Sequence, residues 1–251
     1  MVVVGIIPAR LQSSRLPEKL LLAETGKPLI QYVWEVACGC PELHDVIVAT
    51  DSPRIAESVR SFGGRAELTG EHPSGTDRVA EVVRRCCPDA DIVVNLQGDE
   101  PELESDTISA LVSAVQSSGA EMATIAAPID NADVIRNPNC VKVVTADNGR
   151  ALYFSRSPIP YSRDHSFEDA LQCGERHAWH LHVGLYAYRR NFLLQLTTMP
   201  PSSLELIEKL EQLRALQAGA SIAVAVIPRA AVGIDTREDY DAFVARQRLP
   251  H

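Results

Sequence analysis

The fold is decided close to the N-terminus, where an apolar run, Val2-Val3-Val4-Gly5-Ile6-Ile7, breaks into a basic loop, Pro8-Ala9-Arg10-Leu11-Gln12-Ser13-Ser14-Arg15-Leu16-Pro17-Glu18-Lys19. The run is short, rich in β-branched residues and ends at a proline, which predicts a buried strand. The loop concentrates three cations in a chain whose formal net charge is −9. Because ligands of open α/β sheets bind at the carboxyl ends of the strands, we expect this loop to hold an anion with several charges. The alternative is a solvated basic loop.

The composition is that of a chain that can bury a full core. It has 251 residues, of which 45% are hydrophobic, and a chain of this length hides roughly 70–75% of the surface that its unfolded form exposes. The negative net charge argues against general binding to nucleic acids or anionic membranes. No targeting segment is recognised, and no apolar window approaches the roughly 18 residues that a membrane helix needs. Six cysteines without a C-x-x-C pair predict reduced thiols in a cytoplasmic protein, with a zinc or disulfide site as the alternative.

Strand and helix patterns alternate along most of the chain, which predicts an α/β fold with a largely parallel sheet covered on both faces. The predicted strands span 2–7, 45–50, 91–96, 121–127, 141–145 and 221–227. The predicted helices span 28–38, 53–62, 76–86, 104–117, 202–217 and 236–247. The alternation stops between about 140 and 190, where Asp147-Asn148-Gly149 predicts a hairpin turn and His180–Tyr188 a further strand. We therefore expect a smaller lobe in this region.

A second polar segment, Gln97-Gly98-Asp99-Glu100-Pro101, follows the strand predicted at 91–96. Asp99 would lie at the same sheet edge as Arg10. A carboxylate there repels a phosphate ligand unless a cation lies between them, and Mg²⁺ bound by carboxylates and phosphate oxygens resolves this conflict. Asp235, after the last predicted strand, offers a second ligand, although alone it could cap the helix at 236–247. The acids from Glu100 to Asp106 are expected in a solvated loop and a first helical turn.

Other polar positions are less specific when each is taken alone. Ser74 and Arg78 lie at the start of the helix at 76–86, which fits both a phosphate site and a plain N-cap. Thr50-Asp51 ends another predicted strand. The sequence contains neither a P-loop nor a G-x-G-x-x-G fingerprint. Four of the seven histidines lie between 165 and 182, where contact with a polar ligand is favoured over a metal site because no carboxylate or cysteine completes a ligand set.

These segments, taken together and in order, resemble the 3-deoxy-D-manno-octulosonate (Kdo) cytidylyltransferase family, and the resemblance covers nearly the whole chain. The matching motifs are Ile7-Pro8-Ala9-Arg10 with the spaced Ser13/Arg15-Leu16-Pro17/Lys19, Gly26-Lys27-Pro28-Leu29-Ile30, Ala49-Thr50-Asp51, Ser74-Gly75-Thr76-Asp77-Arg78, Gln97-Gly98-Asp99-Glu100-Pro101, Asn137-Pro138-Asn139, Val141-Lys142-Val143-Val144, Tyr153-Phe154-Ser155-Arg156, His182-Val183-Gly184-Leu185-Tyr186, Leu204-Glu205, Leu210-Glu211-Gln212-Leu213-Arg214 and Gly233-Ile234-Asp235-Thr236.

The resemblance implies that CTP and Kdo react to give CMP-Kdo and pyrophosphate for lipopolysaccharide assembly, with Mg²⁺ as cofactor. It implies a three-layer α/β/α nucleotide-diphospho-sugar transferase fold, Rossmann-like, with a mostly parallel mixed sheet. Residues 1–251 would form a single nucleotidyltransferase domain, with a smaller lobe at about 140–200 that binds the sugar and forms a homodimer.

The resemblance also assigns residues. The metal ligands implied are Asp99 and Asp235, and these form the catalytic set with Arg10 and Lys19. The nucleotide contacts implied are Pro8, Ala9, Arg10, Lys19, Thr50, Asp51, Ser74, Arg78 and Gln97. The sugar contacts implied are Arg15, Gln97, Arg156, His182, Tyr186, Glu211 and Gln212.

Two positions depart from the family pattern, and three other functions compete. Glu18 stands where the family often has glycine, and Arg237 stands where proline is common; neither change removes an expected ligand.

A CMP-sialic acid or amino-Kdo synthetase shares the chemistry, and the elements around His182 and Glu211 favour Kdo. A sugar-1-phosphate nucleotidylyltransferase would have a glycine-rich first loop. The rival of another class is a nucleotide- or sugar-binding subunit without turnover, against which the complete catalytic set argues.

Overall fold

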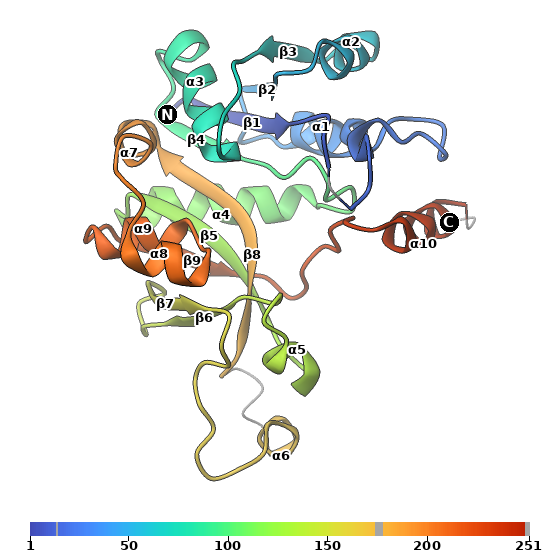
Figure 1. Cartoon of the computed structure of the whole chain (residues 1–251). Coiled ribbons are helices and arrows are strands. Elements are labelled where there is room, and N and C mark those ends of the chain that lie inside the picture. The colour runs from blue at the N-terminus through green and yellow to red at the C-terminus, as the bar shows by residue number, and fades with distance from the viewer. Residues whose placement is uncertain (14, 174–177, 249–251) are drawn as a thin grey trace. The chain divides into compact units, whose positions relative to one another are not determined.

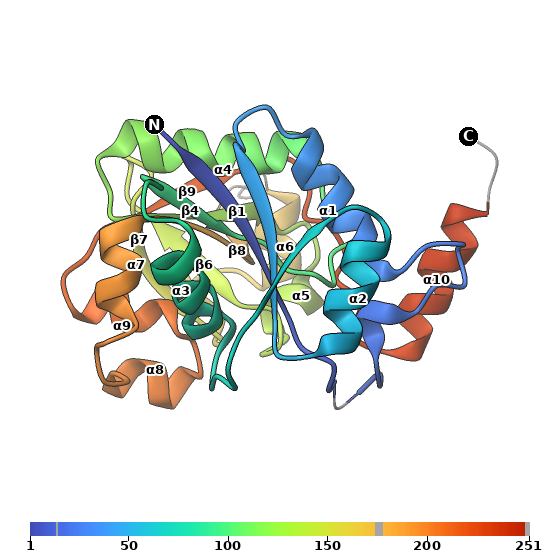
Figure 2. The same cartoon turned by 90° about the horizontal axis from the view of Figure 1, so that it is seen from above.

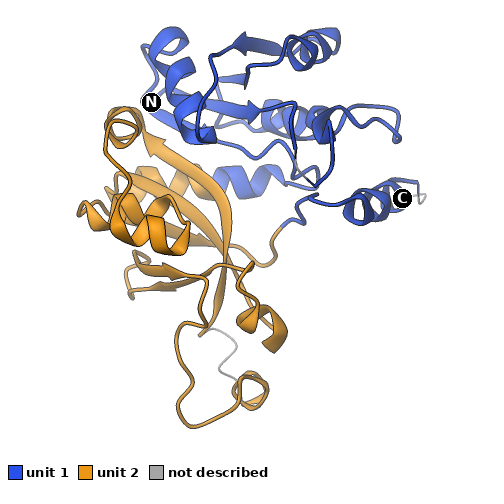
Figure 3. Ribbon diagram, in the orientation of Figure 1, with its two compact units in different colours: residues 1–109, 231–251 blue, residues 110–230 orange. Residues whose placement is uncertain are grey.

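The computed structural model describes residues 1–13, 15–173 and 178–248. The chain divides into two compact units, Met1–Ser109 with Ala231–His251 (unit 1) and Ala110–Ala230 (unit 2), shown in different colours in Figure 3. The lobe expected at about 140–200 lies within unit 2, and its standing as a lobe of one domain stays a prediction. No helix among the described residues is long and apolar enough to cross a bilayer.

Unit 1 is built on parallel strands in the order β3 (Arg65–Leu68), β2 (Asp45–Thr50), β1 (Val3–Ala9) and β4 (Ile92–Asn95), as Figure 1 shows. β1 is buried along nearly its whole length and β4 at every position. Such continuous apolar strands are typical of parallel sheets that helices cover on both faces. The predicted strands at 2–7, 45–50 and 91–96 are thereby confirmed.

Helices cover both sides of these strands. α1 (Leu29–Gly39) and α3 (Gly75–Cys86) lie on opposite sides of β1 and β2 (Figure 2), and α2 (Pro53–Ser61) follows β2. Pro53 occupies the first turn of α2, and the Ser52 hydroxyl caps the helix by accepting a hydrogen bond from the Ile55 N–H. The strand–helix alternation of the sequence therefore gives the expected parallel strands with helices on both faces in unit 1.

The C-terminal helix α10 (Arg237–Gln247) belongs to the same unit through an apolar cluster. Its buried rings of Tyr240 and Phe243 pack with Leu16, Leu29 and Ile234. This cluster joins the basic loop after β1 to the residues before α10, although more than two hundred positions separate them in the sequence. It thus fixes the two chain segments that carry Lys19 and Asp235.

Unit 2 contains a mixed sheet. β5 (Met122–Pro128) pairs antiparallel with β8 (His180–Arg189) and parallel with β9 (Ile222–Val226). β6 (Lys142–Thr145) and β7 (Ala151–Ser155) form the predicted hairpin, which is joined to β8 through β6. The helices of unit 2 are α4, which starts in unit 1 (Ser105–Ser118), α5 (Ala132–Arg136), α6 (Phe167–Gln172), α7 (Arg190–Leu196), α8 (Ser203–Glu208) and α9 (Gln212–Gln217).

The single helix predicted over 202–217 is wrong in one respect. The chain forms two short helices there, α8 and α9, because Lys209 adopts a left-handed conformation (φ 54°) that ends α8. The predicted capping box of Ser202 and Glu205 is present at the start of α8. Strand β3 and helices α5, α6 and α7 were not predicted, since each is too short for a clear period.

Lys142 is a buried cation in unit 2 whose ammonium donates to three main-chain carbonyls, those of Asn137 (3.0 Å), Cys140 (2.6 Å) and Arg156 (2.6 Å). Burial lowers its pKa below the usual value. Lys142→Met would leave these three acceptors without their donor, and we expect a loss of about 3 kcal/mol in unfolding free energy. Urea denaturation of the wild type and the variant measures this difference in unfolding free energy. Lys209→Met, at an exposed side chain, is the matched control, and equal effects of the two changes would contradict this role of Lys142.

Candidate active site

A cavity of about 470 Å³ lies in unit 1, at the carboxyl ends of β1 and β4. This volume is in the range of small-molecule sites. Its lining is rich in cations and polar groups, and the basic loop, the start of α3 and the segment after β4 all contribute. The lining residues are Pro8, Ala9, Arg10, Gln12, Ser13, Arg15, Lys19, Leu20, His72, Pro73, Ser74, Gly75, Arg78, Gln97, Gly98, Asp99 and Asp235.

One glycine lets the walls of this cavity approach one another closely. A Cβ atom at Gly98 would lie 3.3 Å from Ile7 Cγ2, so a side chain there would have to displace its neighbour, and glycine allows the Asp99 segment to lie against the end of β1. A Cβ atom at Gly75 would lie 3.4 Å from Pro8 Cγ, which is ordinary van der Waals contact. The motif around Gly98 therefore has a packing reason as well as a chemical one.

Lys19 occupies the centre of the acidic side of the cavity. Its side chain is only 9% exposed, and its ammonium donates to Asp99 Oδ2 at 2.6 Å, to the Ile234 carbonyl at 2.6 Å and to Asp235 Oδ1 at 3.2 Å. One cation thus draws two carboxylates together, although they lie far apart in the sequence. These contacts place Asp99 and Asp235 together, and their expected role as metal ligands stays a prediction.

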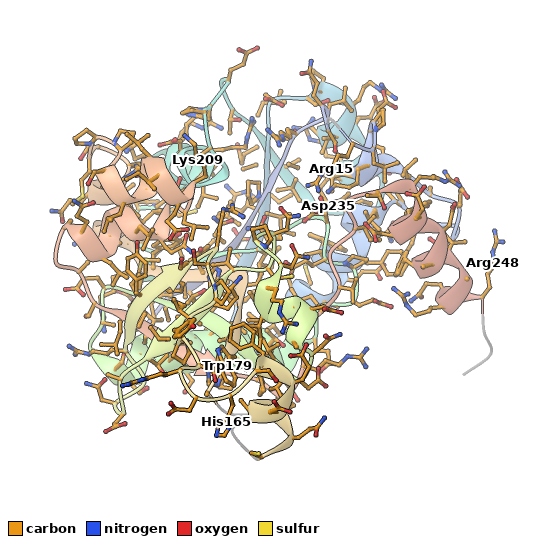
Figure 4. The ribbon with its side chains drawn as sticks, turned by 60° about the horizontal axis from the view of Figure 1, so that its bottom comes forward. Arg15, His165, Trp179, Lys209, Asp235 and Arg248 are labelled. Carbon is orange, nitrogen blue, oxygen red and sulfur yellow. The ribbon has the colours of Figure 1, made fainter. Side chains whose placement is uncertain are left out.

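The alternative that Asp235 caps the last helix is wrong. Thr236 is the N-cap of α10, and it forms a reciprocal capping box with Asp239. The Asp235 carboxylate is instead paired with Lys19 and with Arg15, whose guanidinium lies 3.0 Å away. Arg15 and Asp235 lie side by side in Figure 4. Asp235 is therefore available to the cavity rather than committed to the helix.

The two carboxylates fit a magnesium site. Both contact one nitrogen atom, so their oxygens lie within reach of a single cation. Among the residues that the structure describes, no group of three or more His, Cys, Asp or Glu side chains could hold a metal. One or two carboxylates completed by substrate phosphates and water is the usual arrangement for Mg²⁺ in phosphate-transfer sites. Asp99 and Asp235 would be the protein's contribution.

The cationic residues of the cavity differ in their freedom. Arg10 and Arg15 are exposed and can reorient toward a ligand, whereas Arg78 is only 5% exposed. The Ser74 hydroxyl caps α3 by accepting from the Asp77 N–H at 3.0 Å, so the plain N-cap expected for it is confirmed, and Ser74 also lines the cavity. Thr50 and Asp51 do not line the cavity, although Asp51 contacts Arg78.

The departure at Glu18 has a local compensation. Glu18 adopts a left-handed conformation with φ of 52°, which explains why glycine suits this position. Its carboxylate pairs with both terminal nitrogens of the Arg54 guanidinium, one of them at 2.9 Å. This bidentate pair lowers the pKa of Glu18. The acid therefore has its own partner and does not compete for Lys19.

Two of the residues expected to contact the sugar, Arg15 and Gln97, line the cavity of unit 1. The others lie in unit 2, where a bulge brings two of them together. β5 pairs Thr124 with Tyr186 and Ile125 with Val183, so Gly184 and Leu185 bulge out of β8. The Thr124 hydroxyl donates to the Leu185 carbonyl at 2.8 Å within this bulge. In a regular strand, residues four apart are separated by about 13 Å, but the rings of His182 and Tyr186 are 5.6 Å apart.

The bulge also determines the protonation of His182. The Thr124 hydroxyl proton is directed at two main-chain carbonyls, those of Leu185 (2.8 Å) and Val183 (3.2 Å), so the His182 Nε2–H donates to the hydroxyl at 3.0 Å, which leaves Nδ1 as an acceptor. Burial lowers the pKa of His182 to about 3. Burial, and then the nearby Glu211 charge, raises the pKa of Tyr186 far above its usual value. Both rings are neutral hydrogen-bonding groups at physiological pH.

Gln212 and Arg156 differ in how many of their side-chain N–H donors already bond to the protein. Gln212 is 4% exposed, and its amide Nε2 has no hydrogen-bond partner among the described residues. Arg156 donates to the main-chain carbonyls of Glu208 (2.7 Å), Pro138 (2.9 Å) and Lys209 (3.4 Å). Gln212 therefore has an unsatisfied donor for a ligand, whereas Arg156 is largely engaged in holding the turn after α8.

The chain matches the cytidylyltransferase family model over residues 4–222. It belongs to this family. The 3-deoxy-manno-octulosonate cytidylyltransferase of Rhodopirellula baltica is 49% identical over 96% of each chain, and that of Geobacter sulfurreducens is 45% identical over 97% of this chain and 98% of its own.

Solved structures agree with this membership. A CMP:2-keto-3-deoxy-manno-octonic acid synthetase complexed with CTP superposes with a TM-score of 0.90 at 40% identity, over 98% of both chains. A cytidylyltransferase from Leptospira borgpetersenii shares the fold, with a TM-score of 0.61 at 17% identity over 98% of this chain and 86% of its own. The expected α/β fold with a mostly parallel mixed sheet is thereby confirmed.

His72 is a residue of this cavity that the sequence analysis did not single out. His72 lines the cavity, and its Nε2 lies 2.6 Å from Glu81 Oε2, which fixes the ring. The signal was a histidine two positions before the Ser74 cap. The sequence predicts contact with a polar ligand for the histidines between 165 and 182. Of these, His177 lies outside the described residues.

The expectation that Glu100 lies in a solvated loop is wrong. Its Oε2 atom is buried and has no hydrogen-bond partner among the described residues. Burial, and then repulsion from Asp99, raises the pKa of Glu100 to about 8. The neighbouring Glu102 follows the expectation better, since it pairs with Arg246 at 2.8 Å on the surface. Glu100 is therefore a neutral carboxylic acid below about pH 8.

Glu100 should make the protein less stable as the pH rises. Between pH 4.5 and about 8 the folded protein keeps a proton that the unfolded chain releases, so stability falls across this window. Glu100→Gln removes the titration, and we expect it to stabilise the protein at pH 8.5 by up to about 3 kcal/mol while changing little at pH 5. Thermal denaturation at both pH values measures this. Glu104→Gln, at an exposed position, is the control; the same gain at both pH values would contradict the assignment.

Proposed function

We propose that this protein transfers a cytidylyl group from CTP to 3-deoxy-manno-octulosonate, releasing pyrophosphate. The observation that carries the proposal is the pair of carboxylates, Asp99 and Asp235, gathered around Lys19 in a cavity that also contains Arg10, Arg15 and Arg78. Such a mixture of acids and cations suits a polyphosphate bound with a divalent metal, and the relatives named above carry out this transfer by name.

In the proposed reaction, a hydroxyl oxygen of the sugar acid attacks the α-phosphorus of CTP. A new P–O bond forms, the bond from the α-phosphorus to the pyrophosphate oxygen breaks, and the hydroxyl proton is released. Negative charge grows on the leaving group and on the α-phosphoryl oxygens, so fixed cations such as Arg10 and Lys19 lower the barrier by electrostatic stabilisation. Mg²⁺ would be held by Asp99 and Asp235, where it supplies neutralising charge and acidifies the attacking hydroxyl.

We further propose that unit 2 recognises the sugar acid through neutral groups as well as charges. The pKa of His182 is lowered to about 3, so the ring can accept a hydrogen bond from a sugar hydroxyl at Nδ1 but brings no positive charge. The buried Nε2 of Gln212 can donate to a carboxylate or hydroxyl oxygen, which would satisfy a donor that otherwise has no partner among the described residues. Tyr186 and Glu211 complete the proposed set with Arg156.

Two wider expectations accompany this proposal. We infer a homodimer, which sedimentation at equilibrium would test, and a cytoplasmic location, because all six cysteines are free thiols. The CMP-Kdo formed there would then supply lipopolysaccharide synthesis.

The proposal is tested by steady-state pyrophosphate release with Mg²⁺ and CTP, comparing Kdo, amino-Kdo and sialic acid at equal concentration, with UTP and ATP as nucleotide controls. We expect kcat/KM for CTP with Kdo to exceed every other pair. A preference for amino-Kdo or sialic acid would keep the chemistry and reject the sugar assignment. A preference for UTP or ATP would reject the cytidylyltransferase assignment.

A further inference from the structure

Arg78 is held at two points by residues that end neighbouring strands. Its NH1 donates to Thr69 Oγ1 at 2.6 Å, and its NH2 pairs with Asp51 Oδ2 at 2.6 Å. Asp51 directly follows β2, and Thr69 directly follows β3. The Thr69 N–H donates to the Thr50 carbonyl at 2.8 Å, which extends the β2–β3 ladder by one residue. The two anchors are therefore fixed by the sheet and not by flexible loops.

The anchors leave part of the Arg78 guanidinium for a ligand. A guanidinium has five N–H donors, and the two contacts engage one donor on each terminal nitrogen. Arg78 is 5% exposed and still lines the cavity. A buried guanidinium fixed in this way presents its other donors in one orientation, so little side-chain freedom is lost when an acceptor binds.

The Thr69 hydroxyl can orient the Arg78 guanidinium because it acts both as a hydrogen-bond donor and as an acceptor. It accepts from Arg78 and donates to the Gly70 carbonyl at 3.1 Å, so its lone pair is directed at the guanidinium. Thr69 itself does not line the cavity. Its influence on a ligand would pass through Arg78, which makes it a positioning residue.

We propose that Thr69, together with Asp51, fixes Arg78 so that its free donors meet acceptor oxygens of the bound nucleotide. This inference rests on the proposed binding of CTP. Thr69→Val keeps the shape but removes the acceptor, and we expect it to weaken CTP binding about 10-fold. Thr69→Ser keeps the hydroxyl and should bind CTP within about 2-fold of the wild type.

The test is calorimetric titration of the full-length protein with CTP, for the wild type, Thr69→Val, Thr69→Ser and Asp51→Asn. In turnover assays we expect Thr69→Val to raise KM for CTP about as much as Kd, with kcat and the KM for Kdo nearly unchanged. If Thr69→Val does not fold, Asp51→Asn still removes the charge of the other anchor and must weaken CTP binding. Unchanged CTP affinity in the folded variants, or equal losses in Thr69→Ser and Thr69→Val, would overturn the proposal.

Two further titrations identify the oxygens concerned. Cytidine has no phosphates, and inorganic tripolyphosphate has no nucleoside. If Thr69→Val binds cytidine more weakly than the wild type does, the acceptor oxygens lie on the base or ribose. If it binds tripolyphosphate more weakly, they lie on the phosphate chain. Unchanged affinity for both ligands would overturn the proposal. A wild-type protein that binds CTP without turnover would reject the proposed function and leave this inference standing, whereas a wild type that does not bind CTP would reject both.

Discussion

Asp99→Asn should lower turnover by at least ~10²-fold and leave the fold intact. The change keeps the size of the side chain and removes the negative charge that Lys19 contacts at 2.6 Å. Because the carboxylate would also be a ligand of Mg²⁺, its loss removes both the counter-charge and one anchor for the metal. We expect kcat to fall and the Mg²⁺ concentration for half-maximal rate to rise, both measured by pyrophosphate release.

The control for this variant is Asp106→Asn, which neutralises an exposed acid in the first turn of α4. It should turn over as the wild type does, within about 2-fold, since surface charges outside a site contribute little. Circular dichroism of both variants would verify the fold. Near-normal turnover in Asp99→Asn would contradict the assignment of Asp99 as a metal ligand.

Lys19→Met should have the second large effect, and it should affect stability as well as activity. The ammonium satisfies Asp99, Asp235 and the Ile234 carbonyl at once. Without it, two carboxylates face each other, and among the described residues the ion pair left to them is that of Arg15 with Asp235. We expect a loss of about 2 kcal/mol in unfolding free energy without metal, a moderate figure because both carboxylates are partly exposed. Turnover should fall by at least ~10²-fold because a fixed cation is lost.

The stability of Lys19→Met should depend on magnesium more than that of the wild type. A divalent cation can take the place of the missing ammonium between the carboxylates, so added Mg²⁺ should raise the melting temperature of the variant by more than it raises that of the wild type. Lys27→Met, which breaks a surface pair with Glu35 and does not touch the cavity, provides the control. The same magnesium response in all three proteins would show that Lys19 does not organise the two carboxylates.

The parts of this structure that follow from the sequence are those with a long or strong local pattern. The apolar run before Pro8 forms β1, and the Asp99 segment lies beside the end of β1 because the parallel strands β1 and β4 end on the same side. Asp235, before α10, contacts the same lysine as Asp99. Residue type alone predicts that such acids repel phosphate. The sequence could not show that Lys19 lies between them, since this contact depends on the apolar packing of α10 against Leu16.

The details that were not predicted come from backbone irregularities. The bulge at Gly184 brings His182 and Tyr186 together against the regular spacing of a strand, and a left-handed Lys209 divides one amphipathic pattern into two helices. Neither has a reliable periodic signal, because each is decided by tertiary contacts such as the Thr124 hydroxyl in the bulge. The burial of Glu100 has a different cause, since it depends on tertiary neighbours such as Gly233, which lies far away in the sequence.

The most direct measurement is identification of the product by mass spectrometry after the purified protein has been incubated with CTP, Kdo and Mg²⁺. We expect one new species with the mass of CMP-Kdo, formed in equal amount to the pyrophosphate released, and none when Mg²⁺ is removed by a chelator. Folded protein that binds CTP yet forms no sugar nucleotide with any of the sugar acids would contradict the proposed transfer and would make the protein a binding subunit.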